Sequence, residues 1–213
     1  MKIALLSATT VSIQPIEHAF KEIDSDIEIF HLLDSSLLPM LKTEKSITPA
    51  IIQRFVKLID LAESANADAV LFTCSAFNNI AAIIQPLYNI KLFRSDEAML
   101  NQASKYDRVG LVSTVNETPI ALESYIKQLK PTIHVESVVD DGIINLLNVG
   151  KEEEHDQRVR EMIDQMKAKV DVIVLSQYSI AHVKKQVSSD IPILTAPDES
   201  VRHCIKYLQG SSN

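Results

Sequence analysis

Short apolar runs alternate with longer amphipathic stretches along the chain, and this alternation restricts the fold more than any other feature. The runs are rich in Val, Ile, Leu and Phe, as expected of parallel strands that helices bury on both faces. Strands are predicted at residues 3–6, 27–31, 69–72, 90–93, 109–112, 133–139, 172–175 and 193–194. Apolar residues at helical spacing predict a helix over residues 49–65, with Thr48 as its N-cap, and Thr118 opens another helix in the same way. The class is therefore α/β, with helices on both faces of parallel sheets.

The two halves of the sequence repeat each other. Residues 2–7 match 108–113, 15–16 match 119–120, 68–74 match 171–177, and 96–98 match 198–200. The matches keep the same order, with spacings of 102 to 106 residues, which is hard to attribute to the general likeness of buried strands. We predict two α/β halves, the first made of residues 1–97 with 198–213 and the second of residues 98–197.

Composition excludes several classes of ligand. The 213 residues include only 4 glycines, and none has the spacing of a phosphate-binding loop or a dinucleotide-binding turn. The net charge of −7, without a run of Lys or Arg, argues against a nucleic-acid partner. The 2 cysteines and 6 histidines show no zinc-site spacing, so we expect no metal and no cofactor. No apolar run is long enough to span a membrane, and we expect a cytoplasmic protein without a membrane partner.

Polar side chains follow the predicted strands at the point where each strand ends. In open parallel sheets, ligands bind beyond the carboxyl ends of the strands. The candidate ligand-binding residues there are Ser7, Thr9, Thr73, Ser75 and Asn78 in the first half, and Ser113, Thr114, Ser176, Gln177, Tyr178 and Ser179 in the second. Hydroxyls and backbone N–H groups at helix starts suit a small carboxylate. Cys74 is the candidate acid, base or nucleophile, because the same field at a helix start stabilises a thiolate.

Residues 71–78, around the thiol of Cys74, and their counterparts at 172–179 resemble the aspartate/glutamate/hydantoin racemase superfamily. The resemblance covers essentially the whole chain. It implies two flavodoxin-like halves related by pseudo-twofold symmetry, a cofactor-free site between them, and catalytic thiols on opposite faces of a substrate's α-carbon. Cys74 matches the first of these thiols, as catalytic acid/base, whereas Gln177 stands where the second is expected and Ala76 replaces a hydroxyl of the first motif.

Three functions are compatible with a single thiol. In the first, the protein is a racemase or isomerase acting on a small carboxylate, with Cys74 on one face and Tyr178, a water or His155 on the other. In the second, Cys74 acts on one face only, as in a decarboxylase, lyase or isomerase. In the third, the crevice binds a small carboxylate without chemistry.

The segment 34–41 is too apolar for a free surface loop and too interrupted by Pro39 for a regular strand. We predict that it covers the crevice as a lid or forms part of a homodimer face. We also expect a homo-oligomer, specifically a dimer.

Overall fold

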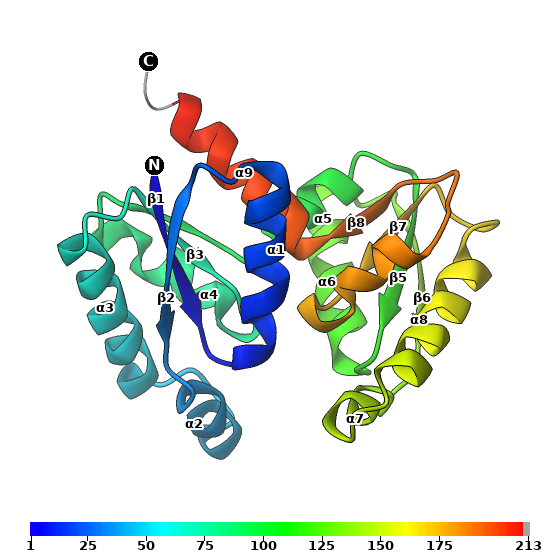
Figure 1. Cartoon of the computed structure of the whole chain (residues 1–213), viewed down its shortest axis with the longest axis horizontal. Helices are drawn as coiled ribbons and strands as arrows, with labels where there is room; N and C mark the ends of the chain where they lie inside the picture. The colour runs from blue at the N-terminus through cyan, green and yellow to red at the C-terminus, as the bar shows by residue number, and fades with distance from the viewer. Residues whose placement is uncertain (211–213) are drawn as a thin grey trace. The chain divides into compact units, whose positions relative to one another are not determined.

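The computed structural model describes residues 1–210, apart from the side chains of Glu117 and Asn148. The chain forms two compact units, one made of Met1–Glu97 with the C-terminal segment that starts at Ser200, the other of Ala98–Glu199. Each unit contains one four-stranded parallel sheet flanked by helices (Figure 1), so the α/β class is confirmed. Within the described residues, no helix is long and apolar enough to cross a membrane.

The first unit is built on a sheet with the strand order β2-β1-β3-β4. Its strands are β1 (Lys2–Ser7), β2 (Glu28–Leu33), β3 (Ala69–Phe72) and β4 (Lys91–Phe93). The helical elements of this unit are η1 (Thr10–Ser12), α1 (Ile13–Ile23), α2 (Leu37–Glu44), α3 (Pro49–Ser64), η2 (Ser75–Phe77), α4 (Asn78–Ile84), η3 (Gln85–Leu87) and most of α9 (Ala196–Gly210).

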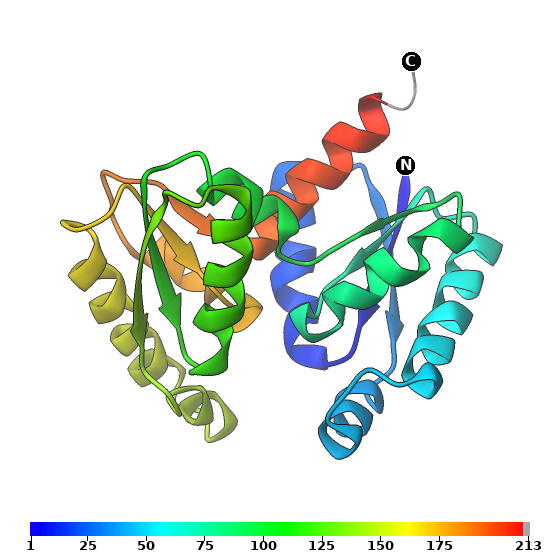
Figure 2. The same ribbon diagram turned by 180° about the vertical axis from the view of Figure 1, so that it is seen from behind.

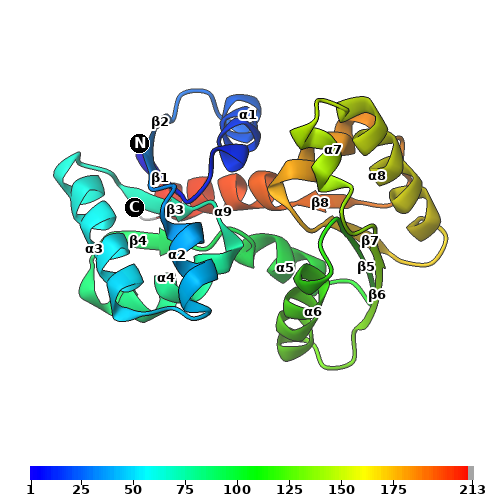
Figure 3. The ribbon, with the colours of Figure 1, turned by 90° about the horizontal axis from the view of Figure 1, so that it is seen from below.

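Alternate residues of the central strands β1 and β3 are buried on opposite faces of the sheet. Ala4, Leu6, Val70 and Phe72 pack on α3 and α4 on one face. Figure 3 shows α1 and α9 on the other face. There the Phe93 ring makes edge contacts with His203 and Tyr207 of α9, with ring centroids 5.2 and 5.4 Å apart. Burial on both faces explains why β1 and β3 are almost wholly apolar.

The second unit repeats this strand order, as β6-β5-β7-β8. Its strands are β5 (Arg108–Ser113), β6 (His134–Val139), β7 (Val172–Leu175) and β8 (Ile193–Thr195). The helical elements are α5 (Glu97–Ala103), α6 (Glu117–Leu129), α7 (Ile144–Asn148), α8 (Glu152–Met166) and η4 (Tyr178–Gln186). Two apolar clusters hold it together, one between the sheet and α5 with α6 (Figure 2), the other between the sheet and α8 with η4.

Gly110 is the strand residue that lets α8 approach the second sheet. A Cβ atom at this position would lie 3.1 Å from a methyl carbon of Val170 and 3.5 Å from Met166. Such a contact is tighter than most side chains tolerate, so the smallest residue stands where the C-terminal end of α8 crosses β5.

The predicted strands all form, with ends within two residues of the prediction. Thr48 caps α3, since its hydroxyl accepts a hydrogen bond from the Ile51 N–H at 3.4 Å. The predicted cap at Thr118 is wrong. Asn116 occupies the N-cap position of α6, and the Thr118 hydroxyl accepts from the side chain of Gln177 instead.

The segment 34–41 contains the start of a helix, α2. Pro39 lies in its first turn, where a missing N–H costs no intrahelical hydrogen bond. Leu37 is fully buried, and Leu38 and Met40 pack against the core of the first unit. This apolar segment therefore covers the first unit's own core, while its roles as a lid and as a dimer face stay predictions.

Candidate functional site

The carboxyl ends of β1 and β3 bring most of the first unit's candidate residues together. The two strands are paired, with Leu6 opposite Phe72, so that Ser7 and Thr73 emerge side by side. Cys74 follows directly and occupies the N-cap position of η2. This edge is where a parallel sheet of this kind binds ligands.

Three buried hydroxyls at this edge hydrogen bond to one another. The hydroxyl oxygen of Thr73 lies 2.8 Å from that of Ser7 and 2.9 Å from that of Ser12. The Ser12 hydroxyl also donates to the carbonyl of Thr9 at 3.1 Å. Ser12, which sequence reasoning missed, thus ties the loop after β1 to β3. Ser7 and Thr73 are engaged in this network, which ties the residue before the thiol to the end of β1 and to η1.

Cys74 differs from these hydroxyls because its side chain is only partly buried. It lines a shallow hollow, too small to hold a water molecule, together with Leu6, Ala8, Phe55, Phe72 and Phe77. Burial among these apolar groups raises the pKa of the Cys74 thiol, and the backbone N–H of Ala76, which contacts the sulfur, lowers it by less. The expected stabilisation of the thiolate is therefore overcome by desolvation, and the free protein holds Cys74 as a thiol at neutral pH.

Alkylation of Cys74 is expected to need alkaline conditions. Because the thiolate is the reactive form and its pKa is raised, the rate with iodoacetamide should climb about tenfold per pH unit and show no plateau below about pH 9. Mass spectrometry of native protein, quenched at intervals between pH 6 and 10, measures this rate. Cys74→Ala, which leaves only the buried Cys204, should take up no label. A plateau below pH 8 would contradict the raised pKa.

Among the candidate hydroxyl residues of the first unit, Thr9 and Ser75 remain accessible. Ser75 is exposed in the first turn of η2, and Thr9 is partly exposed before η1. The Thr9 hydroxyl accepts a hydrogen bond from the N–H of Val11 at 3.5 Å, which leaves its proton available to a ligand.

Asn78 lies at the same edge, but its side-chain amide already has partners inside the first unit. Its carbonyl oxygen accepts from the backbone N–H of Ser95 at 2.9 Å and from the Ser95 hydroxyl at 3.2 Å. Its NH₂ group donates to the carboxyl of Asp96 at 2.5 Å. Burial raises the pKa of Asp96 to about 6. These contacts hold the Asn78 side chain against Ser95 and Asp96.

Asp96→Asn is expected to remove a pH dependence of stability. The folded pKa of about 6 exceeds the ordinary value of 3.8, so the folded state holds the proton more tightly. The stabilisation is complete below about pH 4 and is lost as the pH rises through 6, a fall of up to about 3 kcal/mol. Asparagine keeps an acceptor for Asn78 and cannot ionise.

Urea denaturation of both proteins between pH 4 and 7 measures the difference. As the pH rises, the free energy of unfolding of the parent should fall relative to that of the variant. Hydrogen bonds from Arg108 lower the pKa of Asp171, so Asp171 makes the free energy of unfolding rise with pH. This contribution is the same in parent and variant and cancels in the difference between them. Parallel curves for parent and variant would refute the buried-carboxyl assignment.

In the second unit, Gln177 connects the end of β7 to the end of β5 and the start of α6. Its side-chain oxygen accepts from the backbone N–H of Thr114 at 3.1 Å. Its NH₂ group donates to the hydroxyl of Ser113 at 3.0 Å and to that of Thr118 at 3.5 Å. An amide cannot exchange a proton at neutral pH, and this one is fully engaged in holding the strand ends.

Two hydroxyls at this second edge are buried without a hydrogen-bond partner among residues 1–210: those of Thr114 and Ser176. Such groups are rare and call for an explanation, such as a water or a ligand. Tyr178 and Ser179 follow in the first turn of η4, both partly buried, and the Tyr178 ring packs on the α5 and α6 side of the sheet. Ser176, one of the candidates at the strand ends, directly follows β7, as Thr73 follows β3.

The residues that can hold a metal ion are a different set. His155, Asp156 and His182 of the second unit place one ligand atom each within 4.8 Å of one another. They belong to α8 and η4, two elements that pack against the same face of the sheet. No sequence spacing signals this cluster, because 26 residues separate Asp156 from His182.

Comparison with known proteins agrees with this architecture. The Asp/Glu/Hydantoin racemase family matches residues 5–204. Solved structures with the same fold include an allantoin racemase from Klebsiella pneumoniae (TM-score 0.76, 15% identity, covering 99% of this chain and 89% of that one). An aspartate racemase homologue from Pyrococcus horikoshii gives a TM-score of 0.74 at 16% identity, covering 98% and 99%. A glutamate racemase from Bacillus anthracis gives 0.72 at 16% identity, covering 98% and 82%. A search of curated proteins finds no match.

Proposed function

Because the chain belongs to the Asp/Glu/Hydantoin racemase family, we propose that it is a cofactor-independent racemase or isomerase. Its reaction moves a proton at the α-carbon of a small carboxylate, an amino acid or a related acid, and Cys74 is the acid/base. The observation that carries this proposal is the thiol itself. It is partly exposed at the carboxyl end of β3, while the adjoining hydroxyls of Ser7 and Thr73 are buried and bonded to each other.

The substrate carboxylate is bound by hydroxyls and backbone N–H groups rather than by arginine. In the first unit, the accessible hydroxyls of Thr9 and Ser75 support this role. In the second unit, Thr114, Tyr178 and Ser179 are the proposed donors. The other predicted binding residues, Ser7, Thr73, Asn78, Ser113 and Gln177, already hydrogen bond within the protein, which supports a role in positioning.

A one-face reaction is the second candidate, and the raised pKa of Cys74 favours it. A thiol that stays protonated at neutral pH is in the correct state to deliver a proton to a carbanion, as a decarboxylase or lyase requires. Gln177, at the equivalent position of the second unit, offers no second proton. Racemisation instead requires the small thiolate fraction, which is a stronger base because of the same desolvation.

Proton exchange in D₂O distinguishes these functions. The protein is incubated with panels of amino acids, hydantoins, malonates and maleate, and products are followed by NMR and chiral chromatography. Deuterium at the α-carbon of both enantiomers indicates racemisation. Deuterium in one enantiomer only, or loss of CO₂, indicates the one-face reaction. Ligands that raise the melting temperature without any turnover indicate a binding protein and would reject both enzymatic proposals.

A further inference from the structure

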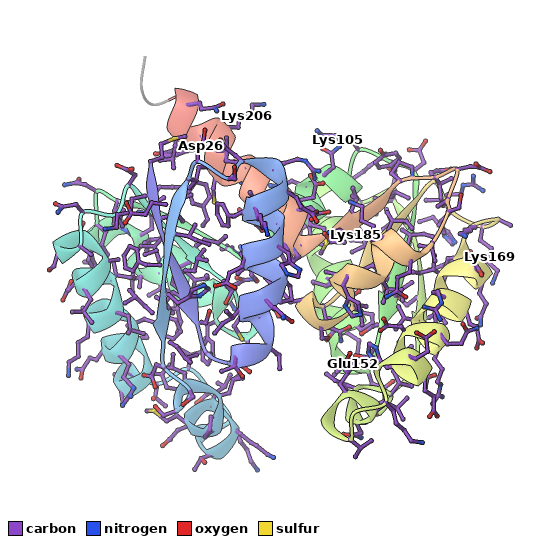
Figure 4. The ribbon with its side chains drawn as sticks, in the orientation of Figure 1. Asp26, Lys105, Glu152, Lys169, Lys185 and Lys206 are labelled. Carbon is purple, nitrogen blue, oxygen red and sulfur yellow. The ribbon has the colours of Figure 1, made fainter. Side chains whose placement is uncertain are left out.

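Two histidines and an aspartate gather in the second unit, and none of them has a role in the proposed function. His155 and Asp156 lie near the start of α8, and His182 lies in η4. Figure 4 labels Glu152, the first residue of α8, and Lys185, which follows His182 in η4, and the cluster lies where these two elements pack together. Their side chains therefore meet through tertiary packing.

The contacts centre on the carboxylate of Asp156. Nδ1 of His155 lies 2.8 Å from Oδ1 of Asp156. Nε2 of His182 lies 2.9 Å from each of the two carboxylate oxygens. The two imidazole rings are nearly parallel, with an interplanar angle of 16° and centroids 6.4 Å apart. Two ring nitrogens thus converge on one oxygen atom.

Neighbouring side chains hold His182 and Asp156 in place. Ile180 and Val183, fully buried, flank His182 and anchor η4 in the same apolar cluster as Val159 of α8. Oδ2 of Asp156 also accepts a hydrogen bond from Nε2 of Gln186 at 2.6 Å. The side-chain oxygen of Gln186 is in turn bonded by Arg160. Outer contacts of this kind are what orients the ligands of metal sites in proteins.

We propose that His155, Asp156 and His182 bind a divalent first-row transition-metal ion such as Zn²⁺. Two imidazole nitrogens and one carboxylate oxygen are the donors that these ions prefer, whereas Mg²⁺ and Ca²⁺ take oxygen ligands. Ligand atoms around a tetrahedral zinc, each about 2.0–2.2 Å from the ion, are separated by about 3.3–3.5 Å. The observed contacts of 2.8 and 2.9 Å, within a set spanning at most 4.8 Å, need only small side-chain rotations to reach that spacing.

The site is open on one side. His155 and Asp156 are buried, but the side chain of His182 is 44% exposed. An ion can therefore enter past His182, and three protein ligands leave a fourth position for water or for a ligand of the ion, as in zinc sites that are not purely structural. Binding uses the lone pairs of Nδ1 of His155 and Nε2 of His182, so each ring carries its proton on its other nitrogen.

Without an ion, the same three side chains can hydrogen bond, with the imidazole N–H groups donating to Asp156. Metal titration distinguishes this hydrogen-bonded cluster from a metal-binding one. Untagged protein is freed of metal with EDTA, exchanged into chelator-free buffer, and titrated with Zn²⁺ and Co²⁺ by calorimetry and absorption spectroscopy. We expect one ion per chain, a dissociation constant of about 10 μM or lower, and Co²⁺ bands without a thiolate charge-transfer band. The same result in Cys74→Ala excludes binding at the thiol.

Variants locate the ion. His182→Ala, at a partly exposed position, and Asp156→Asn should each weaken binding at least about 100-fold, and Gln186→Ala, which removes an outer contact, about tenfold. His134→Ala is the matched control, because His134 also lies beside a carboxylate, at 3.4 Å from Glu136, but has no third ligand among residues 1–210. It should bind like the parent. Absence of Zn²⁺ binding in the parent, or equal affinity in His182→Ala and His134→Ala at unchanged melting temperature, would overturn the proposal.

Discussion

Cys74→Ala is expected to lower α-deuterium exchange at least about 100-fold, because proton transfer by a positioned side chain is worth about 10²–10⁴ in rate. The thiol is the group at the end of β3 that can gain and lose a proton, and neither the Ser7 nor the Thr73 hydroxyl beside it can replace it as a base. The measurement is NMR of the α-proton in D₂O, with the substrate that the panel identifies.

The chain provides its own matched control for this variant. Cys204 is fully buried in α9, and burial raises the pKa of its thiol, so it has no route to a substrate. Cys204→Ala should keep the exchange rate within about twofold at a temperature where both variants are folded, at a cost of about 1 kcal/mol in stability. Equal losses in the two variants would mean that Cys74→Ala acts through folding rather than through chemistry.

Phe55→Ala is expected to lower the free energy of unfolding by about 3–5 kcal/mol, the usual cost of deleting a buried aromatic ring. The Phe55 ring is stacked on that of Phe72, with centroids 5.3 Å apart and planes 3° from parallel. It also contacts the Phe77 ring at 5.0 Å and 48°. These three rings join α3, β3 and η2, so the loss affects the core and the support of Cys74 together.

Urea denaturation measures this effect, and Leu61→Ala on the same helix is the control. Leu61 is exposed, so its removal should change the free energy of unfolding by less than about 0.5 kcal/mol. Phe55→Leu, which fills much of the space, should stay folded and let solvent approach the thiol, so that Cys74 is alkylated faster than in the parent. A cost below 1 kcal/mol for Phe55→Ala would show that the three rings do not form one packed unit.

The strands could be predicted from sequence because burial on both faces demands continuous apolar runs. Residues 69–72 and 172–175 are such runs and form β3 and β7 with the predicted bounds. The helix α2 escaped prediction because Pro39 reads as a break, although a proline in the first turn of a helix costs little. The local sequence pattern of residues 34–41 thus predicted that this segment is buried, but not that a helix begins there.

The candidate site was predictable in position but not in chemistry. Strand ends identified Cys74, and its place at a helix start suggested a stabilised thiolate. Burial beside Leu6 and Phe55, which are distant in sequence, instead raises the pKa of the thiol. Ser12 became visible only through its contact with Thr73. These effects depend on residues that the fold brings together, and a single sequence contains no signal for such pairs.

The path of the chain through its two units determines which unit is fully translated first. The second unit, Ala98–Glu199, is one uninterrupted stretch. The first unit needs α9, whose His203 and Tyr207 cover Phe93 of β4 and whose Ser200 hydroxyl donates to the carbonyl of Ser95 at 2.9 Å. On the ribosome, domains usually complete from the N-terminus onward. Here the first unit begins to be translated before the second but is completed after it, because the helix that covers β4 follows the whole of the second unit in the sequence.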